Sequence, residues 1–364
     1  MKYLPDSIGL YIHIPFCNKK CLYCDFYSAC FNEKVYEDYL SALFREIKEW
    51  GIKINRSVDT VYLGGGTPSI LGRDIVPLMS VIKENFNVSE NAEITAECNP
   101  NDCREFLSSA RKSGVNRLSF GIEAGDDNRL KKLGRMHTKD DCKRAIDFAR
   151  QLGFDNISVD IMIALPDSNL STLKEDIDFI LSLHPEHISA YMLKIEENTA
   201  FYVRQSSLNL PGEDEAAKQY LTLCSELETL GYEHYEISSF AKRNLKSRHN
   251  LKYWRDLEYL GIGPSAHSFI SGKRFYYPRD IKAFIKGNST VSDGTGGGKT
   301  ERMMLGLRTN DGVPTLFLSD VQLKRASALG SVGLLEIKDS KIYLTDRGML
   351  LSNSIITELL YEDI

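Results

Sequence analysis

YIHIPFCNKKCLYC, residues 11–24, joins an apolar run to three closely spaced cysteines. Cys17, Cys21 and Cys24 follow a C-x3-C-x2-C spacing, and thiolates are the ligands that iron–sulfur clusters use. A cubane cluster normally takes four thiolates, so three would leave one iron open to a ligand that is not protein. The spacing therefore predicts a 4Fe-4S cluster with one open iron position.

Two other interpretations of the cysteines compete with the cluster. A zinc site would take His13 or Cys30 as a fourth ligand. Zinc sites usually combine one closely spaced cysteine pair with a second such pair, and the sequence has no second pair. A disulfide would need an oxidising compartment, which eight cysteines in a chain of this length do not indicate. The cluster is favoured because the residues around the cysteines agree with it.

The composition bounds the class of protein. A chain of 364 residues predicts two or more domains, or one large barrel with an appendage. The formal net charge of -5 provides no basic field, so we do not expect nucleic acid as a partner. The sequence shows neither a signal-peptide pattern nor a run of the ~20 apolar residues that cross a bilayer. We therefore expect a cytoplasmic protein, and the sequence leaves open a peripheral contact with a membrane surface and an oligomeric state.

Strand-like and helical patterns alternate through the first two thirds of the chain, as they do in proteins with a parallel sheet. Chemistry in such sheets gathers at the carboxyl ends of the strands. The cysteines follow the first expected strand, three glycines follow the second, Glu97 follows the third and Glu123 follows the fourth. The pattern predicts an α/β fold, namely a partial, open (β/α)6 TIM-like barrel. Strands are expected at 9–14, 59–63, 92–96, 117–121, 157–163 and 187–193, and helices at 35–50, 74–86, 102–113, 138–152, 170–183 and 214–230.

Three regions are expected along the chain. Residues 1–231 form the barrel, residues 232–299 hold an aromatic segment and a Gly/Ser/Thr linker at 287–299, and residues 300–364 form a small α+β module. Within this C-terminal module, residues 335–344 predict a hairpin that turns at Asp339 and Ser340, which is typical of a winged-helix-like unit.

Polar residues near the expected strand ends suit a small ligand. The glycines at 64–66 allow the backbone to approach a ligand closely, although a tight turn needs glycines as well. Asp160 lies inside an apolar run, where an unpaired carboxylate is costly, and could hold a ribose diol. Acidic groups together with a cation suit an amino acid ligand, which carries both an ammonium and a carboxylate. The candidate residues are Glu97, Glu123, Arg135 and Asp160. For each of these residues, an ordinary ion pair is the alternative interpretation.

His249 lies close to two large aromatic residues, Tyr253 and Trp254, after a basic loop. A histidine in this setting could ligate a heme iron while the rings pack on the porphyrin. A histidine that only forms hydrogen bonds is the more common case, and these residues alone do not choose between the two.

Together the motifs resemble those of the radical S-adenosylmethionine (SAM) superfamily, in its coproporphyrinogen dehydrogenase-like branch. The resemblance covers roughly residues 8–350 and rests on residues 11–24, Gly64-Gly65-Gly66-Thr67-Pro68, Glu97-Cys98-Asn99-Pro100 and Arg117-Leu118-Ser119-Phe120-Gly121. It implies a barrel of the radical SAM type with a 4Fe-4S cluster on the three cysteines, whose open iron is chelated by the amino and carboxylate groups of SAM. It also implies SAM contacts at Tyr11, Tyr23, Gly65, Gly66, Thr67, Glu97, Glu123, Arg135 and Asp160.

Two groups within that branch differ in sequence. The anaerobic coproporphyrinogen III dehydrogenases carry a fourth cysteine two residues after the third, where this chain has Phe26. The heme chaperones lack that cysteine and carry H-N-x-x-Y-W, which is present here from His249 to Trp254. The resemblance therefore implies a protein that binds heme as cargo at His249, Tyr253 and Trp254 and delivers it to heme-requiring apoproteins, with respiratory ones expected. Oxygen-independent coproporphyrinogen III dehydrogenase activity is the alternative, so the sequence leaves open whether the protein is an enzyme.

Glu123 departs from the family pattern, which often has glutamine at this position. A glutamate adds a possible negative charge beside the ligand. The sequence therefore leaves open the exact SAM contact at Glu123 and SAM turnover itself.

Overall fold

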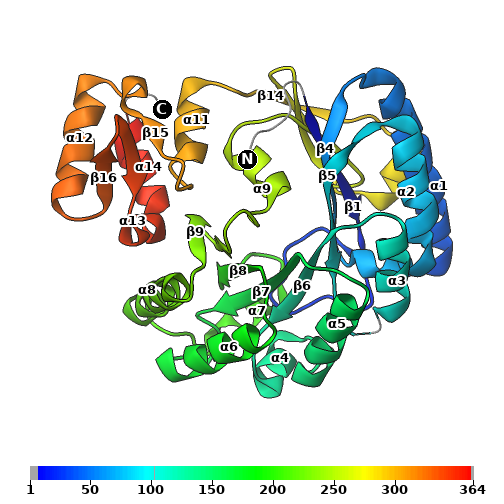
Figure 1. Cartoon of the computed structure of the whole chain (residues 1–364), viewed down its shortest axis with the longest axis horizontal. Coiled ribbons are helices and arrows are strands. Elements are labelled where there is room, and N and C mark those ends of the chain that lie inside the picture. Colours follow the sequence, from blue (N-terminus) through cyan, green and yellow to red (C-terminus); the bar gives the residue numbers. More distant parts are fainter. Residues whose placement is uncertain (1–6, 102, 362–364) are drawn as a thin grey trace.

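A parallel sheet forms the centre of the computed structural model, which describes residues 7–101 and 103–361. Six of its strands follow one another in the order β1-β4-β5-β6-β7-β8, and neighbouring strands are parallel. These strands are β1 (Ile8–Ile14), β4 (Ser57–Gly65), β5 (Asn87–Cys98), β6 (Arg117–Glu123), β7 (Ile157–Ile163) and β8 (His187–Met192). They curve into an incomplete barrel (Figure 1), which confirms the predicted partial (β/α)6 architecture.

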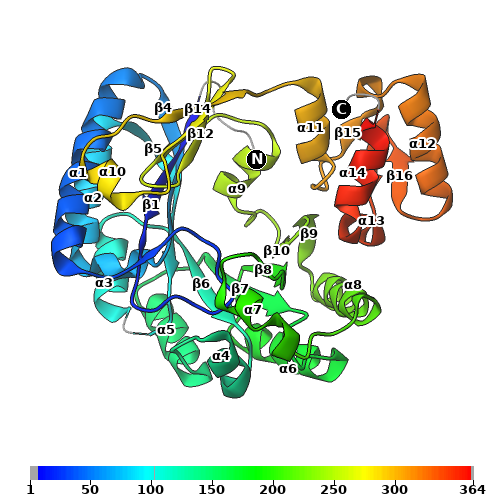
Figure 2. The ribbon, with the colours of Figure 1, turned by 180° about the vertical axis from the view of Figure 1, so that it is seen from behind.

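Helices cover the outer face of this barrel, and each follows its strand along the chain (Figures 1 and 2). The expected helix 138–152 begins with a capping box, in which Thr138 and Asp141 each accept a hydrogen bond from the other's backbone N–H. The covering helices are α1 (Glu33–Lys53), α2 (Ile75–Asn85), α3 (Arg104–Lys112), α5 (Lys139–Gln151), α6 (Leu170–Ser182) and α8 (Glu213–Thr229). Shorter elements between them are β2 (Phe16–Cys17), β3 (Ala29–Cys30), α4 (Asp127–Leu133), α7 (Ala200–Val203) and the 3-10 turns Pro68–Asp74 and Gln205–Ser207.

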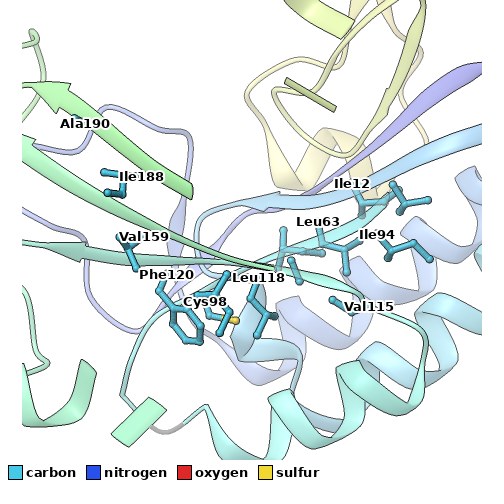
Figure 3. Packing of buried hydrophobic residues seen from close by; sticks show 14 of the residues in the cluster. Ile12, Leu63, Ile94, Cys98, Val115, Leu118, Phe120, Val159, Ile188 and Ala190 are labelled. Atoms are coloured by element: carbon cyan, nitrogen blue, oxygen red, sulfur yellow. The ribbon is translucent and has the colours of Figure 1, made fainter. Parts of the chain in front are cut away.

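Apolar and polar residues alternate along the barrel strands, and this alternation separates the core from the lumen. Apolar side chains such as Leu63, Leu118 and Val159 are fully buried and point toward the helices (Figure 3). Because successive side chains of a strand point to opposite faces, the polar residues between them face the inside of the barrel. Complete TIM barrels fill this space with branched apolar side chains. Here the inward positions are instead Tyr62, Thr95, Glu97, Arg117, Ser119, Ser158, Asp160, His187, Ser189 and Tyr191.

The sheet continues beyond the barrel strands on both sides. Next to β1, the strand β11 is parallel, and the following strands are antiparallel; next to β8 come two short antiparallel strands. The additional strands are β9 (Glu233–Glu236), β10 (Ser239–Ala241), β11 (Tyr259–Ile262), β12 (His267–Ile270), β13 (Lys273–Tyr276) and β14 (Val291–Thr295). Strand β14 lies in the stretch expected as a linker, and its residues are all exposed because it is the edge strand and pairs only with β13.

Three short helices belong to the region between the barrel and the C-terminal module: α9 (Arg248–Trp254), α10 (Ile281–Ile285) and α11 (Lys299–Gly306). Figures 1 and 2 show α9 at the opening between the two sides of the incomplete barrel. The backbone amide of His249 donates to Glu93 of β5 at 3.0 Å, and the Lys252 ammonium pairs with Asp59 of β4 at 2.7 Å. Asp59 is the third residue of β4, and Glu93 pairs with the next residue, Thr60, so α9 closes the amino end of the lumen.

The C-terminal module holds the predicted hairpin. Strands β16 (Leu335–Lys338) and β17 (Lys341–Leu344) pair antiparallel, and Asp339 and Ser340 between them have φ angles of 50° and 58°. Two left-handed residues are what a two-residue hairpin loop requires. The rest of the module consists of β15 (Val313–Pro314), a 3-10 turn (Thr315–Phe317), α12 (Asp320–Ser331), α13 (Asp346–Leu350) and α14 (Ser352–Leu360). In the described part of the chain, none of the helices has both the length and the apolar character of a membrane span.

Candidate functional site

Three cysteines gather in the loop that follows β1, at the carboxyl end of the barrel. The Thr67 hydroxyl donates to Cys17 Sγ at 3.4 Å, and an Arg135 N–H donates to Cys21 Sγ at 3.4 Å. Burial and the neighbouring sulfurs raise the pKa of Cys24 to about 11. The raised pKa favours the protonated thiol. A bound metal favours the thiolate instead, because the thiolate is the form that coordinates metals. Two hydrogen-bond donors aimed at the sulfurs and three free thiols from one loop are what an iron–sulfur cluster needs.

The proposed fourth zinc ligands are not arranged to complete a zinc site. Both ring nitrogens of His13 are engaged: Nδ1 with the Tyr11 hydroxyl at 3.0 Å and Nε2 with the carbonyl of Tyr27 at 2.9 Å. Burial lowers the pKa of His13 to about 4. Cys30 is exposed in β3, although its backbone pairs with that of Cys17. The donor set therefore fits a cluster held by three thiolates.

A cavity of about 310 Å³ adjoins the cysteine loop. Cys21, Thr67, Asn99 and Arg135 are among its lining residues. The Arg135 guanidinium donates to Asn99 Oδ1 at 2.6 Å, and the Asn99 amide donates to Thr67 Oγ1 at 3.1 Å. Residues that the sequence places far apart are thus linked around the sulfurs by a continuous chain of hydrogen bonds.

The glycine loop after β4 is packed tightly under the cysteine loop. Gly65 has a φ of 118°, and a Cβ on Gly66 would lie 2.6 Å from the carbonyl oxygen of Phe16. Only glycine fits such positions without displacing the backbone. The amide of Gly65 donates to Glu97 Oε2 at 3.1 Å, and that of Gly66 donates to the carbonyl of Ile14 at 2.8 Å. In this structure the glycines hold neighbouring segments close together, and these two amides are already used inside the protein.

Glu123 ends β6 in a strained conformation, with a φ of 71°. Non-glycine residues in this region cost energy and cluster at functional sites. Its carboxylate lies 3.6 Å from the Arg135 guanidinium and accepts a hydrogen bond from the Tyr23 hydroxyl. Burial raises the pKa of Glu123, and the Arg135 charge opposes this rise. The structure therefore brings together Tyr23, Glu123 and Arg135, as the family resemblance implied.

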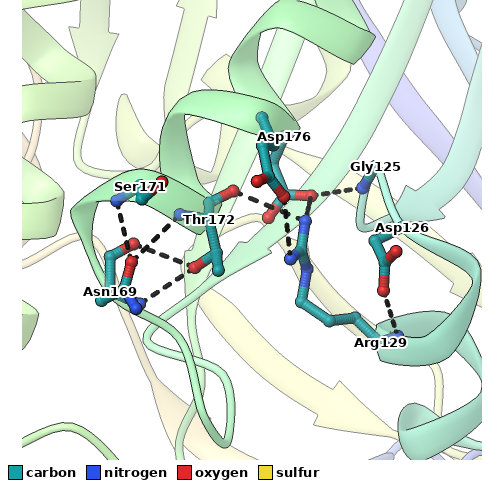
Figure 4. A network of polar contacts seen from close by, with 8 residues as sticks. Gly125, Asp126, Arg129, Asn169, Ser171, Thr172 and Asp176 are labelled. Atoms are coloured by element: carbon teal, nitrogen blue, oxygen red, sulfur yellow. Dashed lines mark hydrogen bonds and ion pairs between the residues drawn. The ribbon is translucent and has the colours of Figure 1, made fainter.

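A buried ion pair holds the loop that follows Glu123. Figure 4 shows the Asp176 carboxylate of α6 between the amide of Gly125 and the guanidinium of Arg129, and the second contact measures 2.8 Å. Asp126 caps α4 by accepting from the amide of Arg129 at 2.9 Å. The segment between Glu123 and Arg135 is thereby tied to α6, which fixes the position of both residues.

Replacing Arg129 with alanine is expected to lower the free energy of unfolding by about 3 kcal/mol, because it leaves the Asp176 carboxylate buried without its charged partner. Glu175 provides the matched control, since its side chain is 61% exposed and it contacts the same arginine. Glu175→Ala is expected to cost less than about 1 kcal/mol. Urea denaturation of both variants measures the difference, and equal losses would show that burial of Asp176 does not decide the cost.

Two carboxylates face the lumen deeper in the barrel. Glu97 accepts hydrogen bonds from the Tyr62 hydroxyl at 2.9 Å and from Gly65, and Asp160 accepts from the hydroxyls of Ser119 and Ser189. Burial, together with the repulsion between acidic groups, raises the pKa of Glu97 and of Asp160 to about 7. Both carboxylates therefore change charge near neutral pH.

His249 lies at the opposite, amino end of the lumen and is fully buried. Its Nδ1 forms a hydrogen bond with Thr60 Oγ1 at 2.8 Å, and its Nε2 forms one with the Tyr253 hydroxyl at 2.7 Å. Burial lowers the pKa of His249 to about 3, so the imidazole is neutral, which is the form that ligates metals. Iron ligation at this residue has to replace one of the two hydrogen bonds.

Trp254 does not join the other two residues of the aromatic motif. Its ring packs against Tyr235, Ala241 and Leu251, and it donates a hydrogen bond to Glu236. Tyr253, in contrast, meets the His249 ring edge-on at a centroid distance of 5.2 Å.

Two neighbouring tyrosines lie between the two candidate sites. The Tyr62 ring lies 5.2 Å from the ring of His249, while its hydroxyl binds Glu97. Tyr11 lies beside it, with ring distances of 6.0 Å to His13 and 6.4 Å to His249. The cysteine site and the histidine site therefore occupy the two ends of one lumen.

Tyr191 and Arg117 line the same lumen and were not among the predicted site residues. Tyr191 is 45% exposed, so solvent reaches the carboxyl end of the lumen beside it. The alternation of polar residues along His187-Ile188-Ser189-Ala190-Tyr191 is the signal that could have identified the tyrosine.

Comparison with known proteins adds independent information. Residues 11–180 match the profile of the Radical SAM superfamily. The heme chaperone HemW of Bacillus subtilis (strain 168) is 36% identical to this chain, over 97% of this chain and 99% of that protein. The heme chaperone HemW of Lactococcus lactis subsp. lactis (strain IL1403) is 32% identical, over 97% of both chains.

A solved structure shares the whole architecture. The coproporphyrinogen III oxidase HemN of Escherichia coli, described as a radical SAM enzyme, has a TM-score of 0.83 with this chain, over 98% of this chain and 91% of that one. Its identity of 22% means that the likeness concerns the fold. The full-length relatives decide the assignment, and this chain belongs to the radical SAM superfamily and, within it, to the family of the heme chaperones HemW.

Proposed function

We propose that this protein binds heme and transfers it to heme-requiring apoproteins. The observation that carries the proposal is the neutral, aromatic-flanked His249 at the floor of the lumen whose other end holds the three cysteines. Relatives that match almost the full length are heme chaperones, which supports the same function. We further propose that it acts in the cytoplasm and that its recipients include respiratory proteins.

The cysteine end of the lumen is proposed to bind a 4Fe-4S cluster and SAM. When bound, the cluster supplies an open iron that the amino and carboxylate groups of SAM can chelate. Around it, Arg135 offers a cation for a carboxylate, and Glu97 and Glu123 offer acceptors for amino N–H groups and negative charge for the sulfonium. Asp160 is placed to accept hydrogen bonds from a ribose diol. The complete proposed set is Tyr11, Tyr23, Gly65, Gly66, Thr67, Glu97, Glu123, Arg135 and Asp160.

SAM affinity is expected to increase as the pH rises from about 6 to about 8, because the carboxyl groups of Glu97 and Asp160 ionise across this range and SAM carries a fixed positive charge at its sulfonium. Stability should change in the opposite direction. The folded pKa values of about 7 exceed the ordinary values of 4.5 and 3.8, so between these limits the folded protein holds protons that the unfolded chain releases. The free energy of unfolding therefore falls as the pH rises through this window.

Equilibrium dialysis of SAM against the reconstituted protein measures the affinity across this pH range. Asp160→Asn is the matched variant, since the amide keeps the shape but does not titrate, and its affinity should vary less with pH than that of the wild type. An affinity that is equal at both ends of the range in the wild type would contradict the expected ionisation.

The proposed function is tested by loading the protein with heme and mixing it with an apo-cytochrome. Transfer is followed by the appearance of the recipient's own heme spectrum and by its recovered activity. Free heme at the same concentration is the control, because spontaneous uptake must be slower than delivery for the protein to act as a chaperone. Recipient reconstitution at the rate seen with free heme would contradict the proposal.

The same preparation, supplied anaerobically with SAM, a reductant and coproporphyrinogen III, tests the enzymatic alternative. We expect no catalytic formation of protoporphyrinogen IX. Several turnovers per protein would replace the chaperone proposal with a dehydrogenase.

A further inference from the structure

Arg117 is a cation buried in the middle of the lumen. It is the first residue of β6 and pairs in register with Thr95 of β5, and only 1% of its surface is exposed. No ion pair or side-chain hydrogen bond links its guanidinium to any residue within the described ranges, and its Nε is fully buried without a partner. The structure thus encloses a full positive charge that it does not neutralise by direct contact.

Such an arrangement is costly and differs from the other buried cations of this protein. A guanidinium stays charged in proteins, and a buried charge is normally paired. Lys252 pairs with Asp59 at 2.7 Å, and Arg129 pairs with Asp176 at 2.8 Å. Arg117 therefore stands out as a cation whose partner is absent from its protein surroundings.

The two carboxylates whose pKa values Arg117 lowers form their hydrogen bonds with other residues. Its charge lowers the pKa of Glu97 and of Asp160, which places all three groups in one region of the lumen. Glu97 is nevertheless bound by Tyr62 and Gly65, and Asp160 is bound by two serine hydroxyls. Because burial keeps both carboxyls only partly ionised at neutral pH, they leave the arginine charge incompletely balanced.

The position of Arg117 suits a ligand that also reaches His249. Strand register places Arg117 opposite Thr95, beyond the level of Thr60, which binds His249, and before the level of Asp160, which pairs with Gly121. Tyr191, which follows Ser189 on the inward side of β8, is 45% exposed, so solvent reaches the carboxyl end of the lumen. An anionic group on a ligand that enters from the mouth can therefore approach the guanidinium.

We propose that Arg117 binds a carboxylate of the ligand in the lumen, and that this carboxylate is a propionate of heme. Guanidinium and carboxylate form short, charge-assisted and often bidentate hydrogen bonds, so a propionate would supply the missing partner. The proposal rests on the heme-binding function proposed above. SAM also carries a carboxylate, and the experiment separates the two sources.

The test compares heme with heme dimethyl ester, in which both propionates are uncharged, in wild type and in Arg117→Met. In the wild type, esterification is expected to weaken binding at least about tenfold, as the loss of a charge-assisted contact predicts. In Arg117→Met, heme should bind as weakly as the ester does to the wild type, and esterification should have no further effect. Arg117→Lys keeps the positive charge but lacks the planar guanidinium that can bind a carboxylate through two hydrogen bonds. Its loss of heme affinity should be intermediate.

Several outcomes would overturn the assignment. An unchanged effect of esterification in Arg117→Met would show that the propionate binds elsewhere, while heme binding by the wild type would still support the proposed function. An equal loss for heme and for the ester would show a merely structural role. A fall in SAM affinity in Arg117→Met, with heme affinity kept, would assign the arginine to SAM. If the wild-type protein binds no heme, both the proposed function and the assignment of Arg117 to a heme propionate are overturned.

Arg144→Met is the matched control for the removal of an arginine charge. Arg144 lies on α5, outside the barrel, and its side chain is 62% exposed. Its variant should bind heme, the ester and SAM as the wild type does. Thermal unfolding of all variants shows that each is folded before affinities are compared.

Discussion

Replacing Cys21 with serine is expected to remove the iron and sulfide that anaerobic reconstitution introduces into the wild-type protein. The three thiols come from one loop, and a cluster with an open iron has no spare protein ligand to replace one that is lost. Arg135, which donates to Cys21 Sγ in this structure, would be left beside a weaker acceptor. Iron and sulfide analysis and the visible absorption of the cluster provide the measurement, and SAM binding should be lost with them.

Cys30 offers the matched control for this experiment. It is exposed, and its backbone pairs with that of Cys17, so it is close to the cluster loop without being one of the three predicted ligands. Cys30→Ser is expected to keep iron, sulfide and SAM binding. If it lost the cluster, Cys30 would be a fourth ligand, and the open iron on which the proposed SAM site depends would not exist.

Replacing His249 with alanine is expected to weaken heme binding at least about a hundredfold, which corresponds to about 2.8 kcal/mol, and to remove the spectrum of histidine-ligated heme. The ring is neutral over the physiological pH range because burial holds its pKa at about 3. Its loss removes the proposed axial ligand while the rings of Tyr62 and Tyr253 remain. Titration of heme, followed by its Soret absorption, measures the change.

Two further variants separate ligation from a structural role of His249. Tyr253→Phe keeps the ring but removes the hydrogen bond to Nε2, so it should free this nitrogen and tighten heme binding by up to about fivefold, given that such a bond contributes about 1 kcal/mol. His249→Met fills the volume and offers a thioether, so bound heme should show a changed spectrum. Heme that binds to His249→Ala with wild-type affinity and spectrum would contradict the assigned ligand.

Much of the barrel follows from local sequence patterns. The expected strand 157–163 coincides with β7, and the expected helix 138–152 corresponds to α5, which begins after the cap residue Thr138. Polar residues after the strands were expected to meet at one end of the sheet, and Glu97, Glu123 and Arg135 do lie around the cysteine loop. These features were predictable because periodicity and capping depend on residues only a few positions apart.

The strands that enlarge the sheet were harder to predict. Val291–Thr295 reads as a flexible Gly/Ser/Thr stretch, yet it forms β14 by pairing with β13. Short strands such as β11 are specified by the neighbour that they bind rather than by their own residues. For the same reason, nothing in the local sequence around residue 249 revealed that α9 closes the barrel.

The sequence by itself determined the three thiols, their spacing and the order of the strand–helix units, because these are properties of the chain and its local patterns. Only the tertiary structure decided that His249 and the cysteines occupy opposite ends of one lumen, with Tyr62 between them. It also decided that Arg117 has no protein partner in the described part of the chain, although arginine at the start of a strand reads as an ordinary surface charge. The physical reason is that burial and charge pairing arise from contacts between segments far apart in sequence, which no local pattern records.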